Sequence, residues 1–394
     1  MSRAPGRVTL PLPGDGEGRG KRGRRRTGGE RFLLRIAAVV ALPALVMLPA
    51  SGAEYRRALP GYRYAFPRDH GAHPDFRTEW WYYTGHLAAE DGRRFGYQLT
   101  FFRSAVEQQG VNPSKWAARN LYLAHFAVSD VKGKKLHLGE RLAREGLGEA
   151  GAGTAGLDVR IGDWEAVADG PAHRLRAREG AFAIDLRLEP EKPPVINGEH
   201  GISQKAEGAG YASHYYSITR LKTGGTLTAD GRSLTVAGRS WMDHEFGSGQ
   251  LREDQVGWDW FSLQLDNRAE LMLYQLRHRD GKADPYSSGT LVHPDGRAEH
   301  LRREDFAIEV LETWKSPRSG GAYPMRWRVR VPKAGIEVAV TPAFPDQELD
   351  TAKSTRVVYW EGASRVEGTM AGRPVQGDAY VEMTGYAHPF QKRI

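Results

Sequence analysis

Residues 223–238 read TGGTLTADGRSLTVAG, and this stretch indicates how the chain folds. Leucine, threonine and valine alternate with small or polar residues on both sides of Asp230-Gly231. An Asp-Gly pair supplies the positive φ angles of a two-residue hairpin turn, and flanking alternation of this kind is typical of β-strands. We therefore predict an antiparallel hairpin with its turn at Asp230-Gly231.

The same turn signal recurs along the chain from residue 55 onward. Asp-Gly or Asn-Gly pairs stand at 91–92, 169–170, 197–198, 280–281 and 295–296. Short runs rich in aromatic and β-branched residues lie between these pairs, and no segment keeps a helical period for any length. The best short helix candidates are 114–120 and 303–311. Many short strands with regular turns predict an all-β fold, either a sandwich or a barrel.

Part of the sequence repeats itself. Glu-Trp-Trp at 79–81 resembles Asp-Trp-Phe at 259–261, and Tyr-Gln-Leu occurs at both 97–99 and 274–276. The offset falls from 180 to 177 residues, which a hairpin turn three residues shorter would explain. We therefore predict two similar antiparallel β domains, at 54–248 and 249–394, joined through a Gly-rich polar stretch.

The basic character of the chain belongs to its first 53 residues. Of the net charge of +8, these residues hold +7, and the remainder holds 46 Lys and Arg against 45 Asp and Glu. The charge is therefore no argument for nucleic-acid binding. The absence of cysteine excludes disulfides and thiolate chemistry.

This leader has the form of a secretory signal peptide. A basic run, KRGRRR (21–26), precedes the apolar run IAAVVALPALVMLPA (36–50) and the small residues SGA (51–53). We expect cleavage after Ala53 and a periplasmic or secreted protein. The alternative is a membrane anchor formed by an uncleaved N-terminal helix, but the apolar run is shorter than the roughly 20 residues of a membrane span.

The stretch SWMDHEFGSG (240–249) places three titratable residues between aromatic ones. Side chains two apart in a strand share a face. Trp241, Asp243 and Glu245 therefore share one face of this strand, and His244 points to the other. The same rule puts His214 and Tyr216 on one face of the strand 212–221.

If both strands line one barrel, His214, Tyr216, Trp241 and Asp243 converge inside it, with His244 on the opposite face. Burial raises the pKa of an aspartate because its charged form loses hydration. A protonated aspartate is a general acid, even toward a carbon–carbon double bond, and aromatic faces stabilise a developing cation. We also expect Glu79, Trp80, Trp81 and Glu245 to contribute to the pocket.

Other readings of these residues stay open. A buried aspartate beside histidine is often a satisfied polar pair, and tryptophan is usually core. Asp243 and His244 are poorly placed to bind one ion, because neighbours in a strand point apart. No His-Glu-x-x-His, Gly-x-Ser-x-Gly, phosphate loop or dinucleotide motif occurs. We therefore predict neither a metal nor a cofactor.

Four motifs carry a resemblance to a known family. EWWYYTGHL (79–87), SHYYSITRL (213–221), SWMDHEFG (240–247) and WDWFSLQL (258–265) resemble the AttH/carotenoid 1,2-hydratase family over roughly residues 70–390. The resemblance implies two tandem lipocalin-like β-barrel domains.

The resemblance also implies a reaction. Carotenoid hydratases add water to an isolated double bond of an acyclic isoprenoid, by acid catalysis and without a cofactor. It identifies Asp243 as the acid, and His214 and Tyr216 as residues that shape the cation pocket. Trp241 departs from the pattern, because a tyrosine is expected there in true carotenoid hydratases.

Two functions therefore remain. The first is an exported hydro-lyase-like enzyme acting on an apolar isoprenoid or lipid substrate. The second is a lipocalin-like carrier that passes a lipid or metabolite to an envelope transporter. Lipocalin-like barrels host both kinds of function, so the fold alone does not choose between them. A metal-dependent hydrolase comes third.

Overall fold

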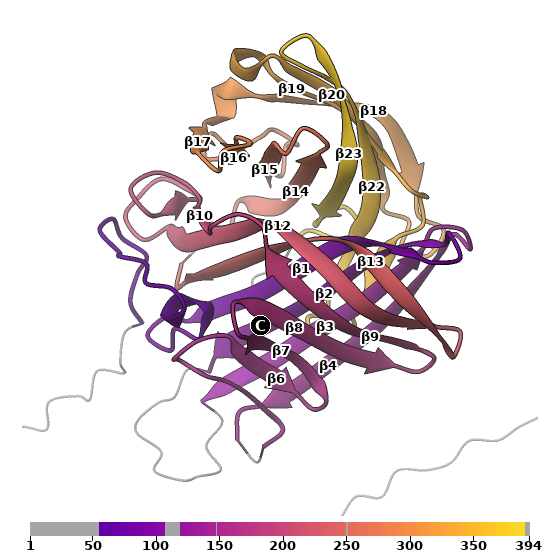
Figure 1. Cartoon of the computed structure of the whole chain (residues 1–394). Helices are drawn as coiled ribbons and strands as arrows, with labels where there is room; N and C mark the ends of the chain where they lie inside the picture. Colours follow the sequence, from indigo (N-terminus) through magenta and orange to yellow (C-terminus); the bar gives the residue numbers. More distant parts are fainter. Residues whose placement is uncertain (1–54, 107–118, 147, 250, 391–394) are drawn as a thin grey trace, which may run out of the picture. The chain divides into compact units, whose positions relative to one another are not determined.

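A computed structural model describes residues 55–106, 119–146, 148–249 and 251–390 (Figure 1). The expected signal peptide and its cleavage site lie outside these residues. Within them the chain is almost entirely β-strand, as predicted, and the helical elements are three short 3₁₀ turns, at Arg68–His70, Arg303–Asp305 and Pro332–Ala334. None of these turns has the length or hydropathy of a membrane-spanning helix.

The helix expected at 303–311 is wrong. Only Arg303–Asp305 is helical, and Ala307–Lys315 forms an edge strand. This strand lies at the end of the second sheet and is exposed along most of its length, so a buried apolar face did not mark it as a strand.

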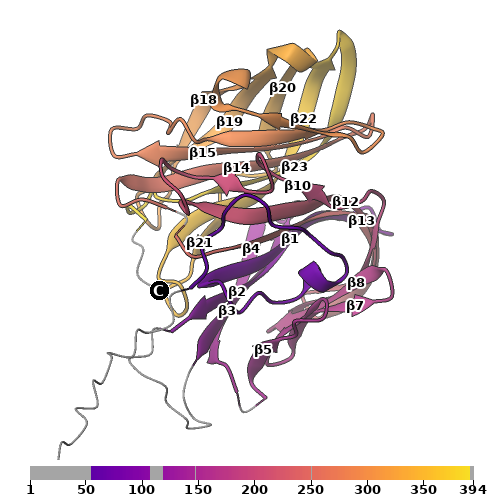
Figure 2. The same ribbon diagram turned by 90° about the vertical axis from the view of Figure 1, so that its left-hand side faces the viewer.

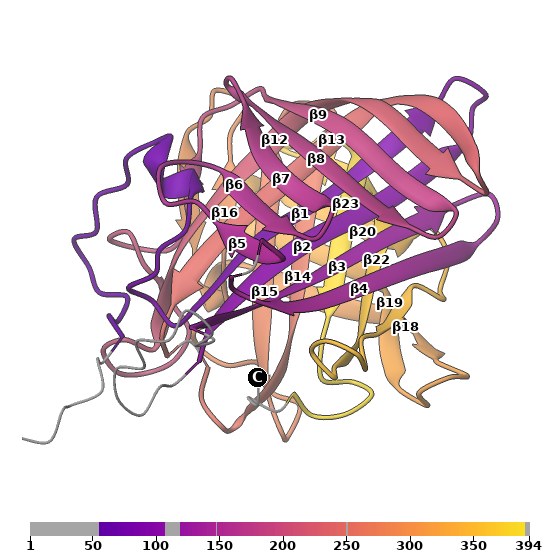
Figure 3. The ribbon, with the colours of Figure 1, turned by 90° about the horizontal axis from the view of Figure 1, so that it is seen from below.

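The first sheet is antiparallel and contains thirteen described strands in the order β4-β3-β2-β1-β13-β12-β9-β8-β7-β6-β5, with β10 and β11 paired to β12. Strand β6 contacts both β3 and β4, so the sheet curls into a nearly closed barrel around an apolar core (Figure 3). Its strands are β1 (Thr78–Ala89), β2 (Arg94–Ala105), β3 (Asn120–Asp130), β4 (Lys135–Arg144), β5 (Ala150–Ala152), β6 (Asp158–Ile161), β7 (Trp164–Asp169), β8 (Ala172–Glu179), β9 (Phe182–Pro190), β10 (Val195–Ile196), β11 (Ser203–Gln204), β12 (Ala212–Ala229) and β13 (Arg232–Gly247).

The second sheet repeats this order with ten described strands, β17-β16-β15-β14-β23-β22-β20-β19-β18, and β21 paired to β22. It forms a half-barrel around a second apolar core. Its strands are β14 (Gln255–Leu265), β15 (Glu270–His278), β16 (Ser288–Val292), β17 (Ala298–Leu301), β18 (Ala307–Lys315), β19 (Ala322–Val331), β20 (Ile336–Pro342), β21 (Glu348–Asp350), β22 (Val358–Met370) and β23 (Arg373–Met383).

The predicted turns and the predicted repeat are both present. Asp230 and Gly231 have φ angles of 51° and 74° and connect β12 to β13. The glycines of the five other predicted pairs also have positive φ. The two similar segments occupy corresponding places, because β1 and β2 stand in the first sheet where β14 and β15 stand in the second. This confirms tandem lipocalin-like sheets, while the division into domains at 54–248 and 249–394 stays a prediction.

The two sheets pack against each other through strands β1, β12 and β13 on one side and β14, β15, β22 and β23 on the other (Figure 2). We call this contact the junction. It buries an aromatic-rich cluster that belongs to neither barrel core, formed by Tyr82, Tyr215, Trp241, Trp260, Met272, Tyr274, Leu276, Ala363 and Tyr380.

Candidate functional site

The register between β12 and β13 divides the candidate residues into two groups. Tyr216 lies directly opposite His244, and Ser217 lies directly opposite Asp243. Residues opposite each other in an antiparallel pair point to the same face of the sheet. Tyr216 therefore belongs to the interior of the first barrel, and Asp243 faces the junction.

The expected convergence of His214, Tyr216, Trp241 and Asp243 is therefore wrong, as is the placement of Asp243 inside the barrel. His214 and Tyr216 share the inner side with His244, while Trp241 and Asp243 share the junction side. The alternation along each strand is as predicted. The error lies in how β12 and β13 are aligned with each other. A shift of one residue between them changes which face of β12 lies beside which face of β13.

Asp243 is a buried carboxyl group surrounded by hydrogen-bond donors. The Tyr215 hydroxyl donates to Oδ2 at 2.6 Å, and the Ser217 hydroxyl and the Trp241 indole donate to Oδ1 at 2.5 and 2.7 Å. Burial raises the pKa of Asp243 to about 7, although these three hydrogen bonds lower it. Near neutral pH this group can therefore give or take a proton.

The second sheet supplies the other side of this site. The Trp260 indole donates to the Tyr215 hydroxyl at 3.1 Å, and the Tyr82 hydroxyl donates to Oε1 of Glu361 at 2.5 Å. Glu382 lies directly opposite Glu361. Burial and the charge of Glu382 raise the pKa of Glu361 well above its usual value. Burial also raises the pKa of Glu382 to about 7.

Three hydrogen bonds and three pairs of directly opposite residues together form a ring across the junction. Tyr82 lies opposite Asp243 in the first sheet, and Trp260 lies opposite Glu382 in the second. We call the closed set the acid ring, in the order Asp243, Tyr215, Trp260, Glu382, Glu361 and Tyr82.

Glu245 and Trp80 also face the junction, because Glu245 is two residues from Asp243 on β13 and Trp80 lies directly opposite Glu245. The Glu245 carboxylate is held in place, because it accepts a hydrogen bond from Ser213 and lies 3.2 Å from the ammonium group of Lys205. Trp80 is only partly buried and, with Trp258, borders the aromatic cluster. Trp80 is thus placed to contact a ligand at the edge of the junction.

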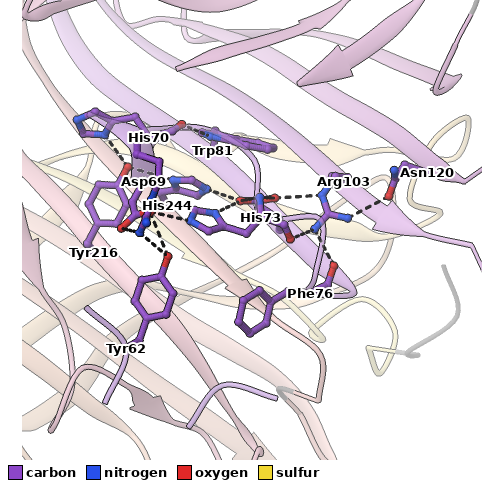
Figure 4. A network of polar contacts seen from close by, with 12 residues as sticks. Tyr62, Asp69, His70, His73, Phe76, Trp81, Arg103, Asn120, Tyr216 and His244 are labelled. Carbon is purple, nitrogen blue, oxygen red and sulfur yellow. Dashed lines mark hydrogen bonds and ion pairs between the residues drawn. The ribbon is translucent and has the colours of Figure 1, made fainter. Parts of the chain in front are cut away.

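Glu79 and Trp81 point the other way, into the first barrel. Glu79 accepts hydrogen bonds from the backbone and ring of His73, from His244 Nε2 at 2.8 Å and from Arg103 Nε at 3.0 Å (Figure 4). Trp81 stacks on His244 with ring centroids 4.8 Å apart. Both side chains lie on the inner face of the sheet, so neither contacts a ligand at the junction.

The contacts of Glu79 continue as a chain of polar groups, which we call the histidine network. His244 Nδ1 lies 3.0 Å from the Tyr216 hydroxyl, which lies 2.7 Å from Nδ1 of His70 (Figure 4). Burial lowers the pKa of His244, and burial and the neighbouring His244 lower the pKa of His70 to about 4. These two rings are therefore neutral at pH 7. Burial also lowers the pKa of His73, but hydrogen bonds to Asp69 and Glu79 outweigh it, and the pKa rises.

Among the residues that the structure describes, His73, Glu79 and His244 form a group that could hold a metal ion, since one ligand atom of each lies within 4.8 Å of the others. However, Glu79 Oε1 is only 2.7 Å from His73 Nδ1 and 2.8 Å from His244 Nε2. Its other oxygen is held by the Arg103 guanidinium. The residues present fit a charge-neutralised hydrogen-bond network better than a cation site.

His214 belongs to neither the acid ring nor the histidine network. Its ring packs against Tyr62 and Phe246 at centroid distances of 4.5 and 5.2 Å, and its Nδ1 lies 3.0 Å from the Gly201 carbonyl oxygen. It therefore holds an N-terminal segment and a loop against the barrel.

The sequence analysis missed several residues of both sites. Trp260 could have been found, because it matches Trp80 in the internal repeat. Glu361 and Glu382 are single acidic residues within aromatic and apolar strands, YWEGAS and YVEMTG, which is a weak signal of a buried carboxyl group. The residues missed are Asp69, His70, His73, Tyr82, Arg103, Tyr215, Trp260, Glu361 and Glu382.

Comparison with protein families gives a match to the AttH-like family over residues 57–386. The chain belongs to the AttH-like family. A solved protein of Nitrosomonas europaea described as an AttH shares 36% identity, with 84% of this chain and 99% of that chain covered and a TM-score of 0.77. A search of curated proteins found no match to the chain.

More distant solved structures share the fold of this AttH-like protein. Kievitone hydratase from Nectria haematococca aligns with a TM-score of 0.64 at 16% identity, over 86% of this chain and 97% of its own. CghA aligns with a TM-score of 0.51 at 12% identity, over 88% and 97%. At these identities the likeness concerns the fold.

Proposed function

We propose that this AttH-like protein is a hydratase-type enzyme that adds water to an isolated double bond of an apolar, isoprenoid or lipid-like substrate. The observation that carries the proposal is Asp243, a buried carboxyl group with a pKa of about 7, placed among aromatic rings at the junction. A general acid works best when its pKa lies near the operating pH. The name of kievitone hydratase, a neighbour in fold, agrees with this chemistry.

The reaction would begin with the protonated form of Asp243. Its proton passes to one carbon of the double bond, and the other carbon becomes a tertiary cation. The rings of Trp241 and Trp260, 6.2 Å apart and nearly perpendicular, and the ring of Tyr215 would stabilise this cation through their negative faces. Water then attacks the cation and loses a proton, so that the product is an alcohol with one added water.

In this proposal, the roles expected of His214 and Tyr216 pass to Tyr215 and Trp260. Tyr215 contacts the acid itself, and Trp260 contacts Tyr215. We further propose, from the leader at 1–53, that the protein acts after export, in the periplasm or outside the cell.

A carrier function is the second candidate, and one observation favours it. Three donors satisfy Asp243 without any ligand, which is also what a structural carboxylate requires. A carrier would bind the same lipid or metabolite at the junction and release it unchanged to an envelope transporter.

The experiment compares three full-length proteins incubated with lipid extract in isotopically heavy water, with products surveyed by mass spectrometry. The proteins are the native chain, Asp243→Asn, and Asp130→Asn as a control at a buried aspartate bound by Arg93 outside the junction. A product carrying one added heavy water, formed by the native and control chains alone, is expected. Product formation by a folded Asp243→Asn would refute the acid, and a lipid bound by all three and recovered unchanged would establish the carrier.

A further inference from the structure

The junction contains three carboxyl groups, whereas a single general acid needs only one. Asp243 and Glu361 are 3% and 2% exposed, and Glu382 is partly buried beside them. Among the residues that the structure describes, none of these three carboxyl groups lies within 4 Å of a basic side chain. A buried carboxylate without a cationic partner is costly, and such groups are candidates for a role in proton transfer.

The acid ring connects these carboxyl groups on both sides. One side runs from Asp243 through the hydroxyl of Tyr215 to the Trp260 indole, which stands directly opposite Glu382. The other side runs through Tyr82, which lies opposite Asp243 and donates to Glu361. Glu382 lies directly opposite both Trp260 and Glu361, and Trp260 donates to the tyrosine that holds Asp243, so the two acids border the same part of the junction.

The members of this ring differ in their access to solvent. Glu361 is enclosed, whereas Glu382 is partly exposed and hydrogen-bonds to Trp258, which is also partly exposed. The ring is therefore more accessible to solvent at Glu382 than at Asp243 or Glu361.

We propose that Glu382 is the second catalytic group of this site and takes the proton from the attacking water, while Asp243 supplies the proton to the double bond. This inference rests on the proposed function. The Asp243 O–H bond breaks as a C–H bond forms. The water oxygen then bonds to the cationic carbon, and one of its protons moves to the Glu382 carboxylate. Glu382 returns this proton to solvent and Asp243 takes one up, so atoms and charge balance over a cycle.

The electrostatics of the ring suit one acid and one base. Carboxylates buried close together cannot all ionise, because each charge opposes the next. Burial and the charges of Asp243 and Glu245 raise the pKa of Glu382, and burial and the charge of Glu245 raise that of Asp243. When the two groups hold one proton between them, Asp243 can be protonated as the acid while Glu382 is ionised as the base. The titratable or charged groups around them among the described residues are Tyr82, Lys205, Tyr215, Glu245, Tyr274, Tyr359, Glu361 and Tyr380.

The first test needs no substrate. Infrared titration of the full chain, with the aspartate carboxyl groups isotope-labelled, follows the protonated form of Asp243, which is identified by its loss in Asp243→Asn. Glu382→Gln should move the deprotonation of Asp243 to lower pH, because a neutral amide no longer opposes its charge. Glu348→Gln, at a buried glutamate held by Ser316 outside the junction, should not move it. An unchanged midpoint in a folded Glu382→Gln would overturn the pairing.

The second test uses the hydration product, if the native chain forms one. Glu382→Gln should lower turnover at least about a hundredfold, as expected for loss of a general base. It should also remove the acidic limb of the pH–rate profile, which a merely structural defect would not do. Full turnover in this variant would overturn the role of Glu382, while the role of Asp243 as the acid would stand. Absence of product from the native chain would instead refute the proposed hydratase activity.

Discussion

The hydroxyl group of Tyr82 lies 2.5 Å from Oε1 of Glu361, so a strand of the first sheet donates directly to a buried carboxyl group of the second. Both side chains are buried, so water from bulk solvent cannot readily take the place of the tyrosine hydroxyl group. The two sheets are thus held together by a polar contact as well as by the aromatic cluster at the junction. Its removal should be measurable as a loss of stability.

Tyr82→Phe should lower the free energy of unfolding by about 1–3 kcal/mol, because it removes one of the two tyrosine hydroxyl groups, Tyr82 and Tyr359, that hydrogen-bond to the buried carboxyl group of Glu361. Urea denaturation of the full chain measures this change. Tyr386→Phe is the matched control, since the Tyr386 hydroxyl contacts Asp259 at 3.2 Å but Asp259 keeps its bond to Arg277. Equal, small losses in the two variants would show that the contact between the sheets contributes little.

Asp243→Asn should stabilise the protein at alkaline pH while it abolishes turnover. The pKa of Asp243 rises from 3.8 to about 7 on folding, so the folded chain holds a proton that the unfolded chain has lost between these values. Stability from this group is therefore present at low pH and lost as the pH rises toward 7. Above pH 7 the variant should be more stable than the native chain by on the order of 2–4 kcal/mol.

Thermal melting at several pH values tests the direction of this pH dependence of stability. The difference between Asp243→Asn and the native chain should grow from pH 4 to pH 7 and then level off. Asp130→Asn should behave in the opposite way, because hydrogen bonds from Gly133 and Arg93 outweigh burial and lower the pKa of Asp130. That variant should lose stability at neutral pH, and the same sign in both variants would contradict our assignment.

Local sequence signals account for most of the fold but for only part of the site. The turn at Asp230-Gly231 and the repeat of Trp80 at Trp260 depend on residues close in sequence or on a simple offset, and both could be predicted. The site depends on register. Whether Asp243 shares a face with Tyr216 or Ser217 is decided by how two strands slide past each other, and alternation within each strand carries no information on this point.

The second sheet's contribution could not be predicted for a different reason. Glu361 and Glu382 lie more than a hundred residues after Asp243 in the sequence and reach it only because the outer faces of the two sheets pack together. The sequence indicates that each sheet has two faces. It does not indicate which outer face meets the other sheet.

Glu79→Gln should be strongly destabilising, because Arg103 is 2% exposed and would lose its carboxylate partner. Removing one member of a buried ion pair costs about 3–5 kcal/mol. Glu165→Gln is the matched control, since Glu165 pairs with Arg160 and Arg176, whose side chains are about half exposed. An exposed pair contributes about 1 kcal/mol or less. Urea denaturation should separate the two variants, and similar losses would show that Glu79 is not the centre of the histidine network.

Metal removal should leave the protein unchanged. Two ligands of one tetrahedral zinc ion, each about 2.1 Å from it, lie roughly 3.4 Å apart. Glu79 Oε1 is 2.7 and 2.8 Å from the two histidine nitrogens, and Arg103 already neutralises the carboxylate, so an added cation would have to displace hydrogen bonds and face a positive charge. We therefore expect no stoichiometric ion by elemental analysis and the same melting temperature with and without chelator. An ion at one per chain that raises the melting temperature, and that His73→Ala loses while His137→Ala keeps it, would make the network a metal site after all.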